Sequence, residues 1–150
     1  MKWVLSHATN ELHHWLLQQE EGSRSLILNQ QRHSLRLNGL SKRLFFLQVQ
    51  GFLNKKVLLR SEYGVVLGET PLTEKLVAAQ LLFNGQRFFY AVEDKRLVLL
   101  DSEKNIVGKC EITEEVAADK YEFYALLFGF AWFLTADAVA DKQRVLPVTA

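Results

Sequence analysis

The sequence predicts a mainly β protein, an antiparallel β-barrel of repeated hairpins that encloses one hydrophobic helix near the C-terminus. Turn signals such as Asn84-Gly85 recur at short intervals between apolar runs, which is typical of consecutive hairpins. A strand-turn-strand pattern at residues 57–66 returns at residues 98–107. Residues 123–136 then carry no charge and are apolar on every face of a helix, so they need a protein interior around them. A barrel that holds this segment in its lumen accounts for all of these features.

Composition indicates one domain without a strong global charge. The chain has 150 residues, and we expect a single domain over 1–150 because only two prolines and no Ser-rich or Gly-rich tract interrupt it. Eighteen Lys and Arg oppose seventeen Asp and Glu, which gives a formal net charge of +1. We therefore expect no nucleic-acid partner, and any anionic ligand needs a local basic patch.

The strands are placed by the turn signals between them. The expected turns lie at Glu21-Gly22, Asn38-Gly39, Asn84-Gly85 and Asp94-Lys95. Polar and apolar residues alternate within 34–37 and 43–50, which predicts half-buried strands. Residues 75–83 are more continuously apolar and predict a strand buried on both faces. Together the segments indicate about ten strands.

The internal repeat predicts a recurring bulged hairpin. Residues 57–66 align with residues 98–107, forty-one positions later. Gly64 and Asn105 then occupy the same place, where a type I turn closed by a bulge needs a left-handed residue. Gly68 and Gly108 follow the returning strands one place out of register.

Residues 26–37 resemble a third, more divergent copy of this unit. The period is close to that of a propeller blade, but three copies make too few blades and leave the terminal apolar run without a place. A closed or nearly closed barrel is therefore the better prediction.

Residues 123–136, FYALLFGFAWFLTA, can form one helix or two short strands broken at Gly129. Asp119 followed by Glu122 matches an N-cap and its capping partner, which favours a helix over about 120–140. Ala125 and Gly129 lie four apart and form a small-residue strip, where we expect a strand backbone to approach closely.

The same segment bears on the membrane question. It is shorter than the roughly 20 apolar residues that a transmembrane helix needs, so we expect that the chain does not span a membrane. The apolar run at residues 1–5 is too brief for a signal peptide, and a cytoplasmic location is the expectation. The alternative, that residues 123–136 anchor the chain to a membrane, predicts detergent-dependent solubility.

A barrel of repeated hairpins with one late hydrophobic helix resembles the tubby carboxy-terminal fold, which the phospholipid scramblases and the LURP-one-related proteins share. The resemblance is carried by VLLRSEYGVVLG at residues 57–68, by the repeat of this pattern at 98–107 and by the helix from 121 to about 138. The chain resembles a small, bacterial-type member of this superfamily. It implies binding of phosphoinositide headgroups through surface basic residues, or action at membranes. The chain lacks the cysteine-rich and proline-rich stretches of scramblases, so lipid scrambling is not implied.

The residues that suit such a role are basic. Lys55 and Lys56 with Arg60, joined by Lys42 and Arg43 across a neighbouring connection, could hold a phosphate by charge-assisted hydrogen bonds. The alternative is that they are solvated lysines and arginines that protect strand edges from aggregation.

Metal and catalytic chemistry find no support in the sequence. His7, His13, His14 and His33 show no ligand spacing and are interpreted as polar surface residues. Cys110 is the single cysteine and alternates into a strand, which indicates a packing role. No nucleophile elbow or phosphate-cradling glycine loop is present, so we expect no enzyme, no metal and no cofactor.

Two functions therefore stand. The first is a non-enzymatic binding or scaffold module that recognises a lipid headgroup or a protein partner through the barrel surface. The second is a carrier of a small hydrophobic ligand in a cavity lined by barrel aromatics. The candidate lining residues are Phe45, Phe46, Phe88, Phe89 and Tyr90.

Overall fold

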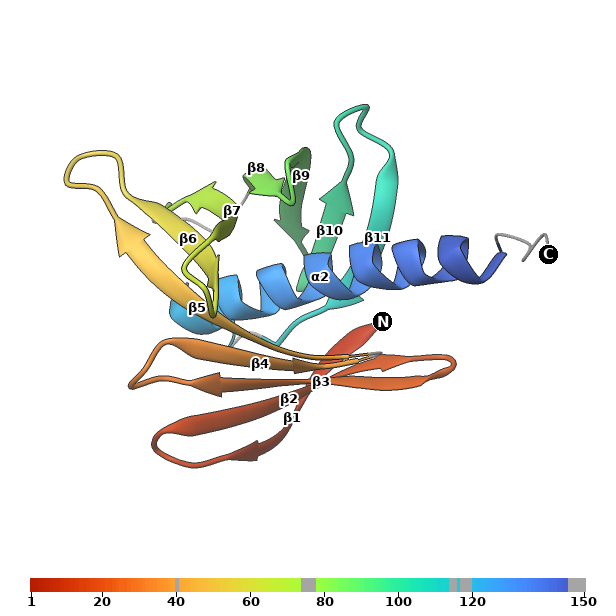
Figure 1. Ribbon diagram of the computed structural model, residues 1–150, viewed down its shortest axis with the longest axis horizontal. Helices are drawn as coiled ribbons and strands as arrows, with labels where there is room; N and C mark the ends of the chain where they lie inside the picture. The colour runs from red at the N-terminus through yellow and green to blue at the C-terminus, as the bar shows by residue number, and fades with distance from the viewer. Residues whose placement is uncertain (40, 74–77, 114–115, 117–119, 146–150) are drawn as a thin grey trace.

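The computed structural model describes residues 1–39, 41–73, 78–113, 116 and 120–145, with the backbone alone at 120 and 137–145. Within these residues, eleven strands close into one barrel (Figure 1). The strands are β1 Lys2–Ala8, β2 Leu12–Gln19, β3 Gly22–Asn29, β4 Ser34–Asn38, β5 Lys42–Gln50, β6 Lys56–Ser61, β7 Val66–Pro71, β8 Ala78–Phe83, β9 Gln86–Glu93, β10 Arg96–Leu100 and β11 Ile106–Glu111. The predicted mainly β barrel is confirmed, with one strand more than expected.

The barrel is a meander closed by one parallel contact. Each strand pairs antiparallel with its neighbours in sequence, and β1 pairs with β11 in parallel, with Lys2 opposite Glu111. The backbone N–H of Glu111 donates a hydrogen bond to the Met1 carbonyl oxygen at 3.0 Å. The two end strands of the sheet are thus joined at the start of β1 and the end of β11, which closes the barrel there.

Helix α2, Lys120–Val145, runs through the barrel between strands β1–β5 and strands β6–β11 (Figure 1). This segment forms one helix and not two short strands, and every residue from Glu122 to Ala131 is buried. The prediction of a central helix is therefore confirmed. The helix begins at the expected place and continues five residues past the expected end at about 140. The proposed N-cap, Asp119, lies outside the described residues. Within the described part of the chain, no helix is both long and apolar enough to cross a bilayer.

Aromatic side chains of the strands pack against the helix around its circumference. The ring centroids of Trp3 and Phe133 lie 6.4 Å apart, and those of Phe45 and Trp132 lie 5.1 Å apart. Because a helix that is apolar all round has no face for water, contact from every side is what its sequence requires. The lumen is therefore the core of the molecule.

Strand glycines make room for the helix side chains. A Cβ at Gly68 would lie 2.8 Å from Cε1 of Phe128, and a Cβ at Gly108 would lie 2.7 Å from Cδ1 of Leu134. Bulky residues of the helix thus lie against the barrel wall at two positions where the strand has no side chain.

Gly129 lies on the helix and makes room for side chains of the strands. A Cβ at Gly129 would lie 2.6 Å from Cδ1 of Leu26 and 3.6 Å from the Trp3 ring. The prediction that a strand backbone approaches here is wrong, because the Leu26 side chain reaches in from β3 and fills the space.

The repeat is real but its period is forty, not forty-one. Strands β6 and β7 lead into the same bulge as β10 and β11, with Leu59 opposite Gly68 and Leu99 opposite Gly108. This register brings the two strand glycines into correspondence, which the sequence alignment had left one place apart. The offset of forty also holds within the turn, since the left-handed residues Gly64 and Lys104 are forty positions apart.

The left-handed turn residues follow the corrected register. Gly64 has a φ of 81°, as predicted. In the second copy the left-handed residue is Lys104, with a φ of 68°, and the prediction of Asn105 is wrong. The turn at Asn84-Gly85 is confirmed, since both residues have positive φ, of 50° and 75°.

Strand β8 differs from the expectation for residues 75–83. Leu81 and Phe83 are buried whereas Gln80 and Leu82 are exposed, so the prediction of burial on both faces is wrong over Ala78–Phe83. The outer face of an antiparallel barrel meets water, and only the lumen side is covered. Residues 74–77 of that segment lie outside the described residues.

Candidate functional site

The aromatics proposed to line a ligand cavity fall on two faces of the wall. Phe45, Phe88 and Tyr90 point into the lumen and are buried, while Phe46 and Phe89 are half-buried on the outer face. Successive strand residues alternate between faces, so the adjacent pairs cannot line one cavity. The inward set packs on the helix, with Tyr90 and Phe123 ring centroids 5.9 Å apart. Helix side chains thus occupy the space that a ligand would need.

A buried carboxylate links the helix to β2. Nδ1 of His13 lies 2.8 Å from Oε1 of Glu122, and Nε1 of Trp15 donates to the same oxygen at 2.6 Å. Glu122 is only 6% exposed, so these bonds replace water around it. The prediction of a surface His13 is wrong, because alternation along β2 points both His13 and Trp15 at the first turn of α2. The arrangement fixes the helix at the barrel mouth.

The other histidines and the cysteine do not form a reactive cluster. His7 is exposed, while His14 and His33 are half-buried, and the His33 ring lies 4.9 Å from that of Tyr121. Among the described residues, no group of three or more His, Cys, Asp and Glu could hold a metal ion. Burial raises the pKa of the Cys110 thiol to about 12, so the thiol stays protonated, and its predicted packing role is confirmed.

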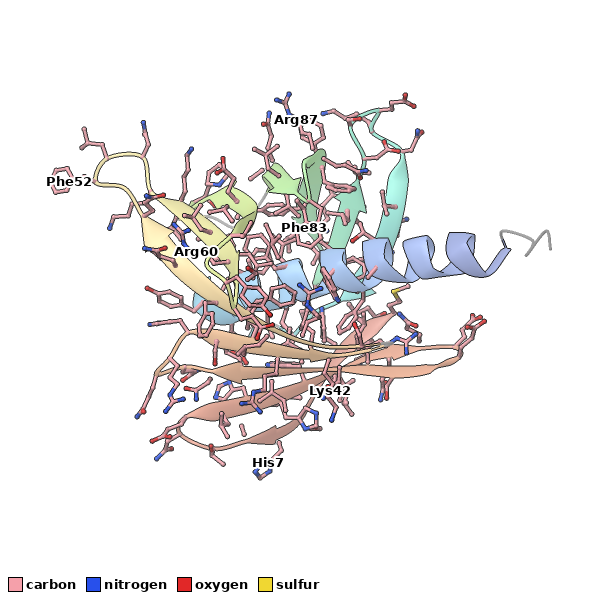
Figure 2. The ribbon with its side chains drawn as sticks, in the orientation of Figure 1. His7, Lys42, Phe52, Arg60, Phe83 and Arg87 are labelled. Atoms are coloured by element: carbon pink, nitrogen blue, oxygen red, sulfur yellow. The ribbon has the colours of Figure 1, made fainter. Side chains whose placement is uncertain are left out.

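The predicted basic patch is divided by the geometry of β5. Lys42 is exposed at the start of this strand, and its neighbour Arg43 points to the lumen, where its guanidinium carbon lies 4.9 Å from the centroid of the Trp132 ring. Lys55 and Lys56 lie beyond the other end of β5, about 26 Å away at the usual rise per strand residue. Figure 2 shows this separation through the labelled Lys42 and Phe52. Lys42 and Arg43 therefore do not join Lys55 and Lys56.

Arg60 is also engaged elsewhere. Its Nε donates to Oε1 of Gln48 at 2.6 Å, and its Nη1 donates to the carbonyl oxygen of Gly64 at 3.0 Å. It lies four residues along β6 from Lys56, or about 13 Å, too far to share one phosphate with it. The basic site is thus reduced to Lys55 and Lys56 at the β5–β6 connection.

Lys55 and Lys56 differ in their surroundings. Nζ of Lys56 lies 3.5 Å from Oε1 of Glu69 on β7, and both side chains are partly exposed, so this ion pair is weak and screened by salt. Lys55 is exposed in the loop, and its carbonyl oxygen accepts a backbone hydrogen bond from Leu72. Both ammonium groups can thus meet a ligand from solvent.

The same loop carries two apolar side chains that the sequence analysis did not single out. Phe52 is 91% exposed and Leu53 is 88% exposed. Figure 2 shows Phe52 pointing away from the barrel at the tip of the loop. An apolar pair between Gly51 and Asn54 is the signal that could have identified a hairpin tip.

The loop has a defined shape and stands clear of the wall. Gly51 has a φ of 105°, and a Cβ there would lie 2.7 Å from the Asn54 carbonyl oxygen, so the loop closes on itself at a position that only glycine fits. The β4–β5 pairing ends at Ser34 opposite Phe46, whereas β5 continues to Gln50. The β5–β6 hairpin consequently projects beyond its β4 neighbour (Figure 1).

Comparisons of the chain with known protein families, with curated proteins and with solved structures find no match.

Proposed function

We propose that this protein is a non-enzymatic binding module that recognises anionic lipid headgroups through Lys55 and Lys56 on the outside of the barrel. The observation that carries the proposal is the unbroken burial of the helix from Glu122 to Ala131, which fills the lumen and leaves recognition to the outer surface and loops. The resemblance to tubby-like proteins, a prediction from the sequence, points to the same class of ligand.

The distribution of charge supports an anionic ligand. Residues 42–61, which form the β5–β6 hairpin, hold five of the eighteen Lys and Arg and none of the seventeen Asp and Glu. The rest of the chain holds thirteen basic and seventeen acidic residues. The hairpin is therefore the basic part of an otherwise acidic molecule, and a negatively charged surface is the partner that complements it.

The expected affinity is modest and depends on salt. A Lys near an anionic membrane surface contributes about 1 kcal/mol, and this contribution falls off within a Debye length. The cytoplasmic location expected from the sequence belongs to the same proposal, because phosphatidylserine and phosphoinositides face the cytoplasm.

The test is cosedimentation with phosphatidylcholine vesicles that contain phosphatidylserine, at low salt. We expect the wild type to sediment and the Lys55→Glu, Lys56→Glu double variant to remain in solution. The matched control is Lys42→Glu with Lys109→Glu, which changes net charge equally at exposed sites away from the loop.

The control makes the result specific to the loop. An equal loss in both double variants would show that net charge alone governs binding, against a site at Lys55 and Lys56. A wild type that stays in solution would overturn the lipid proposal and leave a protein partner as the ligand class to be sought.

A further inference from the structure

The repeat provides an internal reference for the β5–β6 loop. Strand β6 corresponds to β10, so the β5–β6 connection corresponds to the β9–β10 connection. The latter is closed by Asp94-Lys95 alone, with positive φ at both residues, as a tight two-residue turn requires. The β5–β6 connection uses the five residues 51–55 between Gln50 and Lys56. The β9–β10 turn shows that two residues are enough to connect such a pair of strands. The β5–β6 loop therefore has three residues more than the connection needs.

The additional residues bring the exposed apolar pair. Phe52 and Leu53 are 91% and 88% exposed, the two most exposed large apolar side chains among those described, and Tyr63 follows at 87%. They contribute nothing to the core, and adjacent apolar side chains on a projecting tip mark an interaction site.

The size of the tip decides between kinds of partner. A stable protein interface buries about 800 Å² on each partner, far more than two side chains offer. A bilayer needs no complementary surface, because apolar side chains enter its acyl boundary while flanking lysines stay at the headgroups. The exposed Lys55 and the partly exposed Lys56 directly follow the tip, so both requirements meet in one loop.

We propose that the Phe52–Leu53 tip inserts into the headgroup and acyl boundary of an anionic bilayer, with Lys55 and Lys56 at the lipid phosphates. This inference rests on the proposed function and adds an apolar contribution to it. Insertion of each side chain is expected to change the partition coefficient by about tenfold or more, since that is the usual size of burying a Phe or Leu. Unlike the lysine contribution, this part persists at high salt.

The first experiment compares vesicle partitioning of Phe52→Ser with Leu53→Ser against the wild type, on phosphatidylcholine vesicles containing phosphatidylserine. We expect a loss of about a hundredfold for the double variant. The matched control, Tyr63→Ser with Val65→Ser, removes exposed apolar residues from the β6–β7 turn at the other end of the barrel and should partition like the wild type. Both double variants should unfold at the wild-type urea concentration, because the side chains removed are exposed.

The second experiment locates the tip directly. Phe52→Cys is labelled with an environment-sensitive fluorophore, and Tyr63→Cys serves as the control, since both sites are exposed while the native Cys110 is buried and does not compete. We expect a blue shift with vesicles for the label at position 52 alone.

The outcomes separate this inference from the proposed function. Partitioning of the Phe52→Ser, Leu53→Ser variant at the wild-type level, with no blue shift at position 52, would overturn insertion and leave the lysine site standing. Loss in that variant but not in Lys55→Glu with Lys56→Glu would support insertion and overturn the headgroup site. A wild type that binds no phosphatidylserine vesicle would overturn both.

Discussion

The hairpins β6–β7 and β10–β11 share a backbone but not a sequence, and the difference shows which residues the fold requires. Both contain the same bulge, and both place a glycine, Gly68 or Gly108, against a helix side chain. The two copies thus share the glycine that admits a helix side chain, whereas the buried pair Thr70 and Cys110 differs in residue type.

The turns of the two hairpins reach one geometry by different side chains. Oγ of Ser61 accepts hydrogen bonds from the backbone N–H groups of Tyr63 and Val65, both at 3.2 Å. In the second copy Oδ1 of Asp101 accepts the corresponding bonds at 2.9 Å. Any short side chain with an acceptor oxygen can close such a turn, so its residues are free to vary.

The largest expected effect tests whether β1 and β3 enclose the helix as tightly as the hairpins β6–β7 and β10–β11 do. Gly129→Leu should destabilise the protein by roughly 3 kcal/mol or more, because the new side chain would overlap Leu26 in a packed core. Urea denaturation measures the loss. A neutral effect would place this part of the helix in a looser environment than its burial indicates.

The two strand glycines, Gly68 and Gly108, should differ in how much a methyl group costs. Gly68→Ala should cost about 2 kcal/mol, since a methyl group there meets the Phe128 ring and the Leu82 carbonyl oxygen, which cannot move aside easily. Gly108→Ala should cost about 1 kcal/mol, because the nearest atom belongs to the half-buried and flexible Leu134. Equal costs in urea denaturation would mean that the helix side chains adjust similarly at both sites.

The turn glycine gives a smaller effect. Gly64→Val should destabilise by about 1 to 2 kcal/mol, because a β-branched residue resists the left-handed conformation, although a Cβ there meets open space. Val65→Ile is the matched control and should change the free energy of unfolding by only a few tenths of a kcal/mol. If thermal unfolding gave equal shifts for both, the turn would tolerate any residue.

Lys104→Gly tests the corresponding turn position in the other copy. Relief of the left-handed strain should gain about 1 kcal/mol, while Nζ of Lys104 lies 4.3 Å above the Phe89 ring and its loss should cost about 0.5 to 1 kcal/mol. We expect near-neutral stability in the wild-type background and a net gain when Phe89→Leu is already present. A gain of the same size in both backgrounds would show that the cation–π contact contributes nothing.

An effect confined to high pH concerns Cys110, which corresponds to Thr70 in the first copy. The native thiol has a pKa of about 12 against an ordinary value of 9.0, so above pH 9 the unfolded state releases a proton that the native state keeps. Stability is unaffected below the unfolded pKa and falls as pH rises toward the native pKa. Relative to Cys110→Ala, the wild type should lose on the order of 1 kcal/mol between about pH 8 and about pH 10, measured by urea denaturation. A constant difference across this range would show an ionised thiol in the native state.

Local features of the fold were predictable, and contacts between distant segments were not. The Asn84-Gly85 turn and the central helix follow from short-range preferences that the residues carry with them. The pairing of Glu122 with His13 and Trp15 joins segments more than one hundred residues apart, and nothing in either segment specifies the other.

The candidate site shows the same division. Lys55 and Lys56 were recognised as exposed basic residues of one connection. The proposed union with Lys42 and Arg43 failed, because adjacent strand residues face opposite sides and the length of β5 separates its ends. The exposed tip at Phe52 and Leu53 was missed, since apolar residues in a β sequence are ordinarily assigned to the core.

The recurrence of hairpins and the need to surround an uncharged helix follow from the amino-acid sequence, because turn geometry and the exclusion of apolar surface from water act locally. The register of the repeat, the glycines that admit the helix and the apolar side chains that remain outside became known from the folded barrel. These depend on how much room is left once eleven strands close around one helix, and that volume is a property of the whole barrel.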